Sequence, residues 1–325
     1  MYDIGHFRSF SFQIKTISVG NLTVGGTGKT PHIEYIINLL KADRNICTLS
    51  RGYGRKTTGI VFGDNNSTAT SIGDEPMQYL LKYSPQTSVV VGEERALAIP
   101  TIIHELPKTD LILLDDAFQH RPVKPGLNIL LCDFNKPFYS DHLMPTGRLR
   151  ESRSGAKRAD VVLVSKCPDS LSDNEMRVIK SKILPYIQKD VDIFFTGVTY
   201  KEPVPIFRQH KISNHAIAIS GIANPALFVA NLSINYKVLN SYRLPDHHSY
   251  TLKDISAIKD LYKNQQAKNP ALITTEKDMV KLIAFKEALE TLPLFYIPIA
   301  VYFLKDSEKE MFDQKIRSYL DQKLE

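Results

Sequence analysis

Cysteine is scarce in this chain, and its distribution argues against two kinds of scaffold. The 325 residues contain three cysteines, Cys47, Cys132 and Cys167. Three is an odd number and no two of them have the C-x-x-C spacing, so the sequence predicts neither a disulfide framework nor a zinc site. A reducing compartment such as the cytoplasm fits this pattern best.

Long apolar runs are absent as well. The longest candidate, LPLFYIPIAVYFL, is interrupted by Pro298 and is shorter than the roughly 18 apolar residues of a membrane span. The N-terminus shows no basic segment followed by an apolar stretch and a small-residue cleavage site, so no signal peptide is predicted. The amino-acid composition is that of a compact globular protein, with 43% hydrophobic and 23% charged residues.

The net charge is modestly positive, at +6. Such an excess could favour nucleic acid, an anionic membrane face or a phosphorylated substrate, and selects none of them. Aromatic residues do not interleave with basic clusters, so a nucleic-acid-binding ATPase ranks last among the functions considered and no nucleic-acid partner is expected.

Short apolar runs alternate with segments of helical period from about residue 15 to residue 200. This alternation predicts an α/β fold with a mainly parallel sheet flanked by helices. Several runs lack polar alternation, as expected for strands covered on both faces. The predicted strands are TISVG, NICTLS, SVVVG, LILLDD, NILLCD, DVVLVS and DIFFTG.

A linker is predicted at TYKEPVPIF, which contains two prolines. Beyond it the alternation resumes with the strands AIAISG, ALITT and LFYIPI. Because the chain exceeds the usual size of one domain, we predict two, over residues 1–205 and 206–325, with a cleft between them.

The segment GNLTVGGTGKTP, residues 20–31, nearly fits the phosphate-loop pattern G-x-x-x-x-G-K-[ST], although Thr23 stands where a glycine is expected. It follows a predicted strand and opens a segment of helical period, which is the context this motif needs. Lys29 would reach the β- and γ-phosphates of ATP, and Thr30 would hold Mg²⁺. The predicted nucleotide-binding residues are Thr23, Val24, Gly25, Gly26, Thr27, Gly28, Lys29 and Thr30.

Two adjacent carboxylates, Asp115 and Asp116, end the predicted strand LILLDD. A phosphate-loop site needs an acidic residue at the end of a neighbouring buried strand to position its metal. The pair therefore completes a predicted magnesium site, and the sequence leaves open which of the two contacts the metal.

Four further polar clusters follow predicted strands, where ligands bind in open α/β sheets. Phosphoryl transfer to an alcohol requires a base for the hydroxyl proton and cations for the moving charge. Asp74 or Glu75, His247 or His248, and Arg150 could fill these roles. The clusters are SRGYGR (50–55), GDEP (73–76), PTGRLRE (145–151) and PDHHSY (245–250).

Nine segments, in this order, resemble the tetraacyldisaccharide 4'-kinases of lipid A biosynthesis, and they extend over most of the chain. The loop with threonine in first place is itself the form found in that family. The segments are SVGNLTVGGTGKTP, LSRGYGR, GDEP, LDDAFQHR, LCDFNKPF, MPTGRLRE, SGIANPALF, DHHSYT and TTEKDMVKL.

The resemblance implies a phosphate-loop kinase domain that faces a smaller C-terminal α/β domain across the catalytic cleft. It implies that MgATP donates its γ-phosphate to the 4'-hydroxyl of a tetraacylated glucosamine disaccharide 1-phosphate, which yields lipid IVA. By motif, Asp74 resembles the general base and His247 its partner. The remaining implied roles are metal contacts for Glu75, Asp115 and Asp116, and lining of the phosphate and substrate region for Tyr53 and Arg150.

The chain departs from the family pattern in three places. Ala117 replaces the glycine of DDGFQH, and MPTGRLRE differs from the commoner LPAGxLRE. Family members usually begin with a further apolar, basic helix that seats them on the inner membrane, whereas this chain starts at MYDIGHFRSF. We expect a peripheral enzyme at the cytoplasmic face of the inner membrane, with this chain largely soluble. Phe7, Phe10 and Phe12 fit either a membrane-proximal remnant or a core-packing edge.

A phosphate-loop switch or partitioning ATPase is the alternative, because its loop also carries a glycine pair before GKT. Such a protein would need a partner to induce hydrolysis and no acceptor alcohol. Lipid-dependent release of ADP would separate the two functions.

Overall fold

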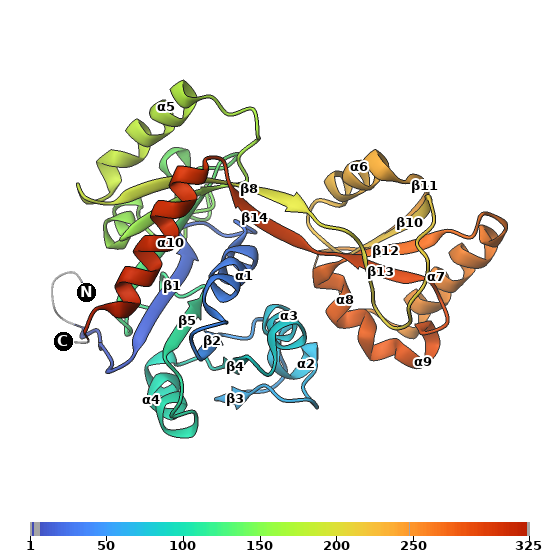
Figure 1. Ribbon diagram of the computed structural model, residues 1–325, viewed down its shortest axis with the longest axis horizontal. Helices are drawn as coiled ribbons and strands as arrows, with labels where there is room; N and C mark the ends of the chain where they lie inside the picture. Colours follow the sequence, from blue (N-terminus) through green and yellow to red (C-terminus); the bar gives the residue numbers. More distant parts are fainter. Residues whose placement is uncertain (1, 3–6, 247, 324–325) are drawn as a thin grey trace.

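The computed structural model describes residue 2 and residues 7–246 and 248–323 (Figure 1). The described chain forms two sheets, which lie side by side in Figure 1 with β8 and β14 running between them. The larger has nine strands and the smaller five.

The larger sheet has the strand order β14-β8-β7-β6-β1-β5-β2-β4-β3. Its pairs are parallel except β3 with β4 and β14 with β8, so the predicted α/β fold is confirmed. Its strands are β1 (Lys15–Asn21), β2 (Ile46–Ser50), β3 (Val61–Phe62), β4 (Thr87–Val91), β5 (Leu111–Asp115), β6 (Leu127–Asp133), β7 (Val161–Ser165), β8 (Asp192–Tyr200) and β14 (Ile299–Phe303).

Helices cover both faces of this sheet, which is why its central strands are apolar throughout. Helices α1, α3 and α10 share one core with the alternate residues Ile17 and Val19 of β1. Helices α4 and α5 pack against the opposite face. The helices are α1 (Lys29–Leu40), α2 (Ala69–Ile72), α3 (Asp74–Tyr83), α4 (Arg95–Glu105), α5 (Asp173–Ile183) and α10 (Asp306–Asp321), with 3₁₀ turns at Phe138–Ser140, Arg153–Arg158 and Leu184–Tyr186.

The smaller sheet has the order β11-β10-β12-β13-β9 and is parallel except for β9. Helix α6 covers one face and α7 the other. Its elements are β9 (Val204–Pro205), β10 (His215–Ser220), α6 (Pro225–Asn235), β11 (Lys237–Arg243), α7 (Leu252–Asn264), β12 (Ala271–Thr275), α8 (Glu276–Leu282), α9 (Lys286–Leu289) and β13 (Leu294–Ile297), with 3₁₀ turns at Gln266–Lys268 and Ile283–Phe285.

The prediction of a single strand at LFYIPI was wrong. Strand β13 ends at Ile297 in the smaller sheet, and β14 begins at Ile299 and pairs antiparallel with β8 of the larger sheet. Pro298 lies between them and has no N–H to continue a ladder, so it ends one strand before the next begins. Strands β3, β9 and β11 were also missed, and β9 lies within the predicted linker.

The chain thus crosses between the sheets twice, after β8 and after β13. The last helix, α10, returns to the larger sheet, where Lys15 Nζ donates to Tyr319 O at 2.9 Å. The division into domains at residue 205 stays a prediction. A cut there would separate β14 and α10 from the sheet on which they pack.

Helices of the two sheets meet at an ion cluster. The ammonium of Lys82 on α3 lies 2.6 Å from a carboxylate oxygen of Glu34 on α1 and 2.5 Å from one of Glu276 on α8. Gln78 Nε2 donates to the other Glu34 oxygen at 2.8 Å. Burial raises the pKa of Glu34 to about 7, and the nearby Glu276 adds to this rise, against the opposing effect of Lys82.

The N-terminal phenylalanines fall into two groups. Phe12 packs against the core beneath α4, as a core-packing edge would. Phe7 and Phe10 are 47% and 54% exposed. Within the described ranges, no helix is long and apolar enough to cross a membrane.

Candidate active site

The glycine-rich loop connects β1 to α1, as predicted. Gly25 and Gly28 have φ values of 105° and 88°, which favour glycine. Gly28 is the N-cap of α1 and no side chain caps this helix. The first N–H groups of α1 are therefore available to an anion at the loop.

The carbonyls of residues 26–28 all accept hydrogen bonds from side chains beneath the loop. Lys166 Nζ donates to the first, Ser165 Oγ to the second at 2.8 Å, and His32 Nδ1 to the third at 2.7 Å. The N–H of a trans peptide points opposite to its C=O, so the N–H groups of residues 27–29 point to the other side. This is the arrangement that a phosphate needs.

His32 is buried beneath the loop, and its other ring nitrogen, Nε2, lies 3.0 Å from Thr196 Oγ1. Burial lowers the pKa of His32 to about 4, so the ring is neutral near pH 7 and donates to the loop without adding charge. Sequence reasoning assigned no role to His32, Ser165 or Lys166. The sequence indicated only their positions: His32 lies near the start of the predicted helix, Ser165 ends the predicted strand DVVLVS, and Lys166 follows it.

Thr23, the departure from the usual motif, lies in an isolated antiparallel bridge with Leu149. The next residue, Val24, donates its N–H to Arg148 O at 2.8 Å. The loop is therefore entered through an extended segment, a conformation that does not require glycine. Threonine fits this position because it is nearly buried in that extended backbone.

Asp116 is held by two cations. Arg150 approaches it with both terminal nitrogens, at 2.8 and 3.2 Å, and Lys29 Nζ lies 3.7 Å away. Burial alone would raise the pKa of Asp116, but Lys29 and Arg150 outweigh it and hold that pKa below its usual value. Arg150 also donates to Asn21 O at 3.1 Å, which ties the acidic pair to the end of β1.

Asp115 has a different environment from its neighbour. It is buried at the end of β5, where Tyr79 Oη donates to Oδ2 at 2.9 Å. Burial raises the pKa of Asp115 to about 7, with Lys29 opposing this rise and Asp116 and Glu75 adding to it. Its Oδ1 has no hydrogen-bond partner among the described residues. A buried oxygen of this kind is suited to a ligand.

Asp74 and Glu75 form the first turn of α3. The preceding Gly73 has a φ of 98°, and a side chain there would meet Tyr53 O at 3.0 Å. The SRGYGR loop thus packs against the GDEP turn and brings the backbone of Tyr53 to it. The Tyr53 side chain itself is 73% exposed.

Lys281, on α8 of the smaller sheet, reaches across to Asp74. Its ammonium lies 3.2 Å from Asp74 Oδ2 and donates to His248 O at 3.0 Å. It therefore joins the GDEP turn to the DHH segment. Sequence reasoning missed Lys281, although it lies within the quoted segment TTEKDMVKL.

One turn earlier on α8, Asp278 holds a second loop of the smaller sheet. Its Oδ2 accepts from Gly221 N at 2.9 Å and from Thr275 Oγ1 at 2.7 Å. Helix α8 thus contacts three of the quoted segments: GDEP, SGIANPALF and DHH.

The DHH segment contains two histidines, His247 and His248. His247, the predicted partner of Asp74, lies outside the described residues. His248 is directed elsewhere, with Nε2 3.0 Å from Asp254 Oδ2 on α7. The described residues contain no group of three or more His, Cys, Asp or Glu side chains that could hold a metal ion.

Three features of this site define a protein of the phosphate-loop nucleotide-binding class: the glycine-rich loop at a helix N-terminus, the lysine that follows it, and the acidic pair that ends the adjacent strand. The chain belongs to the tetraacyldisaccharide-1-P 4'-kinase family, LpxK, which matches residues 1–320.

Two similar proteins are named tetraacyldisaccharide 4'-kinase. The one from Flavobacterium psychrophilum is 42% identical over 99% of this chain and 91% of its own length. That from Phocaeicola vulgatus is 39% identical over 98% and 90%. A crystal structure of LpxK from Aquifex aeolicus in complex with ATP matches with a TM-score of 0.72 at 26% identity, over 98% of this chain and 92% of that one. Membership of this family favours the kinase function for this chain over the alternative, a partitioning ATPase.

Proposed function

We propose that this protein transfers the γ-phosphate of ATP to the 4'-hydroxyl of a tetraacylated glucosamine disaccharide 1-phosphate, producing lipid IVA for lipid A biosynthesis. The observation that supports the proposal is that one helix, α3, connects the phosphate-loop site to an aspartate held by the smaller sheet. Tyr79 bonds α3 to Asp115 beside the loop, and Asp74 begins the same helix and is held by Lys281 from the other sheet.

The loop binds the nucleotide in this proposal. The N–H groups of residues 27–29 donate hydrogen bonds to the phosphate oxygens, and Lys29 turns from Asp116 to the β- and γ-phosphates. Arg150 keeps Asp116 ionised when Lys29 leaves it. The residues lining the nucleotide are Thr23, Val24, Gly25, Gly26, Thr27, Gly28, Lys29, Thr30 and Tyr53.

Mg²⁺ accompanies the nucleotide. The residues near the loop fit this ion, because Thr30, Asp115, Asp116 and Glu75 offer only oxygen donors and one buried oxygen of Asp115 has no partner among the described residues. Mg²⁺ usually takes one or two carboxylates together with phosphate oxygens and water, so a cage of three protein carboxylates is not required. When bound, the ion neutralises charge on the β- and γ-phosphates.

Asp74 acts as the general base, with His247 as its partner. Its carboxylate receives the proton of the 4'-hydroxyl as the oxygen attacks phosphorus. Lys281 acts as a positioning residue, because its ammonium lies 3.2 Å from Asp74 Oδ2 and holds the carboxylate in place. The acceptor is a lipid, so the enzyme works as a peripheral protein at the cytoplasmic face of the inner membrane.

Labelled ATP with the purified tetraacyl disaccharide 1-phosphate tests the proposal. We expect transfer of label to the lipid, detected by chromatography, with release of one ADP per lipid phosphorylated. Lys29→Ala should lower the rates of label transfer and of ADP release by orders of magnitude. The proposal would be wrong if ATP were hydrolysed equally fast without the lipid and the lipid stayed unlabelled. That result would favour a partitioning-type ATPase over a kinase.

A further inference from the structure

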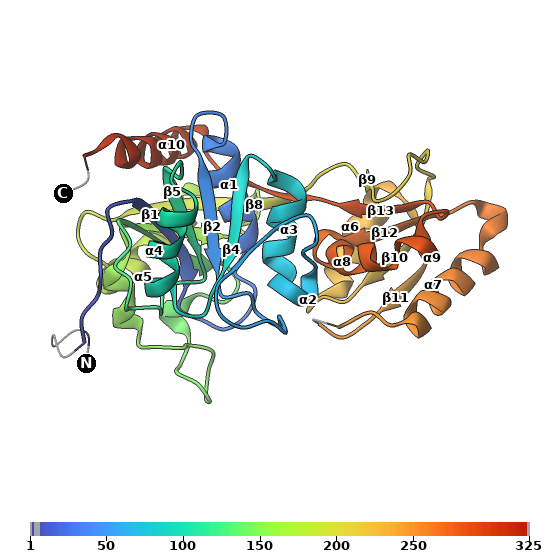
Figure 2. The same cartoon turned by 90° about the horizontal axis from the view of Figure 1, so that it is seen from below.

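The loop of residues 141–149 presents two large apolar side chains to water. Leu143 is 50% exposed and Met144 is 54% exposed. In Figure 2 the green loop between β6 and β7 projects beyond the body of the larger sheet. Side chains of this size are more often buried in a core, so two neighbouring ones exposed at the tip of a loop indicate a surface that binds something.

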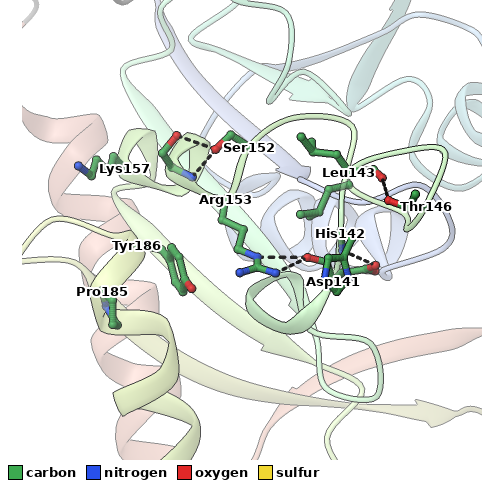
Figure 3. Close-up of a pocket in the computed structure, with 11 residues that line it drawn as sticks. Asp141, His142, Leu143, Thr146, Ser152, Arg153, Lys157, Pro185 and Tyr186 are labelled. Carbon is green, nitrogen blue, oxygen red and sulfur yellow. Dashed lines mark hydrogen bonds between the residues drawn. The ribbon is translucent and has the colours of Figure 1, made fainter.

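This loop is held in one shape by its own hydrogen bonds. Asp141 Oδ1 accepts from His142 N at 2.8 Å and from Arg148 N at 3.1 Å, and Arg153 donates to Asp141 O at 2.7 Å. At the tip, Thr146 Oγ1 donates to Leu143 O at 2.9 Å (Figure 3). The apolar tip is therefore preorganised, and docking it costs little conformational entropy.

The base of the loop is part of the phosphate-loop structure. Leu149 forms the bridge with Thr23, and Arg148 O accepts from Val24 N at 2.8 Å. Arg150 N donates to Leu22 O at 2.8 Å. A surface that meets the tip is thus held at a fixed position relative to the nucleotide site.

Positive charge accompanies the apolar tip. Residues 141–158 contain five basic and two acidic side chains. Arg153 and Lys157 form no ion pair within the described part of the chain and line a cavity of about 650 Å³ beside Leu143 (Figure 3). An apolar tip flanked by unneutralised cations complements a bilayer with anionic headgroups.

We infer that the 141–149 loop inserts Leu143 and Met144 into an anionic lipid bilayer, with Arg153 and Lys157 at the level of the headgroups. This rests on the proposed function, which requires the enzyme to meet a lipid acceptor at a membrane. It adds the surface that docks and the orientation that brings the phosphate loop to the interface.

Tryptophan fluorescence tests the insertion directly, because the chain contains no tryptophan. Met144→Trp in the full chain should shift its emission to shorter wavelength with phosphatidylethanolamine vesicles containing phosphatidylglycerol, and brominated lipids should quench it. Ile234→Trp is the matched control, since Ile234 is 75% exposed on α6 of the other sheet and should not respond. An unchanged Met144→Trp emission, or equal responses of the two variants, overturns the inference.

Vesicle sedimentation gives the energetic test. Leu143→Ser with Met144→Ser should lower the bound fraction at least about tenfold, because half-exposed apolar side chains no longer enter the bilayer. Lys157→Gln should lower binding to anionic vesicles about fivefold and leave binding to phosphatidylcholine unchanged. Full binding by the double variant would overturn the inference. A second result would also overturn it: the wild-type protein self-associates and binds no vesicles, and the double variant loses the self-association. That result would assign the tip to a protein interface.

Kinase assays separate this inference from the proposed function. With acceptor dispersed in detergent, the Leu143→Ser and Met144→Ser double variant should keep wild-type turnover, while with acceptor in vesicles its apparent KM should rise. If the double variant and the wild-type enzyme have equal apparent KM for acceptor in vesicles, the proposed docking surface is wrong and the proposed function is unaffected. A wild-type enzyme that leaves the acceptor unphosphorylated in both settings overturns the proposed function, whatever the vesicles bind.

Discussion

Replacing Lys82 by methionine tests how the helices of the two sheets are held together. The Lys82 ammonium lies between the carboxylates of Glu34 and Glu276, whose side chains are 6% and 4% exposed. Methionine keeps the apolar stem of lysine and removes its charge. The variant therefore leaves two buried carboxylates side by side without this cation.

The magnitude follows from burial. Removing one partner of a buried ion pair costs about 3–5 kcal/mol, because the remaining charge is uncompensated. The Lys82 side chain is 19% exposed, so we expect the lower end of this range, about 3 kcal/mol, at about pH 8.

The loss should depend on pH. The folded-state pKa of Glu34 is raised to about 7 from 4.5, so its protonated form stabilises the fold, fully below the unfolded pKa and progressively less as pH rises through 7. Without Lys82 this pKa rises further. At about pH 5.5 Glu34 is protonated in the variant, and the cost of the substitution should fall to about 1 kcal/mol.

Denaturant unfolding followed by circular dichroism at the two pH values measures both costs. Lys309→Met is the control, because Lys309 pairs with Asp313 on the surface of α10 and should cost less than about 0.5 kcal/mol at either pH. Adding Glu34→Gln to Lys82→Met should remove most of the pH dependence. Equal losses at both pH values would refute the reasoning and assign the effect to packing of the lysine stem.

Three further predictions concern catalysis. Lys29→Ala should lower turnover by orders of magnitude with an unchanged melting temperature, because the lysine stabilises charge that shifts in the transition state; near-normal turnover at saturating MgATP would end the phosphate-loop assignment. Asp74→Ala and His247→Ala should each lower kcat. The double variant should lower kcat by less than the product of the two single fold-losses, because paired groups act as a unit. Fold-losses that multiply would show that the two residues share no proton-transfer step. Lys281→Ala should lower kcat with little change in KM for ATP, and Lys281→Arg should restore part of it; a loss in KM alone would contradict a role in positioning Asp74.

The local part of the site could be predicted from the sequence. A glycine-rich loop, the lysine after it and the acidic pair at the end of a strand are defined by residues close together in the chain, and β1 and β5 then place them side by side. The parallel sheet was predictable as well, because strands that are buried on both faces are recognised from short, uninterrupted apolar runs.

The long-range part of the site could not be predicted in this way. Lys281 meets Asp74 only because α8 of one sheet packs against α3 of the other, and no periodicity in the sequence encodes that contact. The end of β13 was missed because the apolar run continues through Pro298, so hydrophobicity alone gave one strand. The role of His32 beneath the loop depends on Thr196, which lies far along the chain.

The return of the chain to the larger sheet has a consequence for synthesis on the ribosome. Residues 204–297 emerge between β8 and β14, so the smaller sheet can be complete while the larger one still lacks its edge strand. The face of the larger sheet that carries α1 also stays partly uncovered until α10 delivers Phe312 and Ile316 to its core. A polypeptide released before α10 would contain every phosphate-loop residue and still display apolar surface, which is the feature that chaperones and proteases act on. The fold thereby makes the synthesis of α10 a condition for the survival of the enzyme.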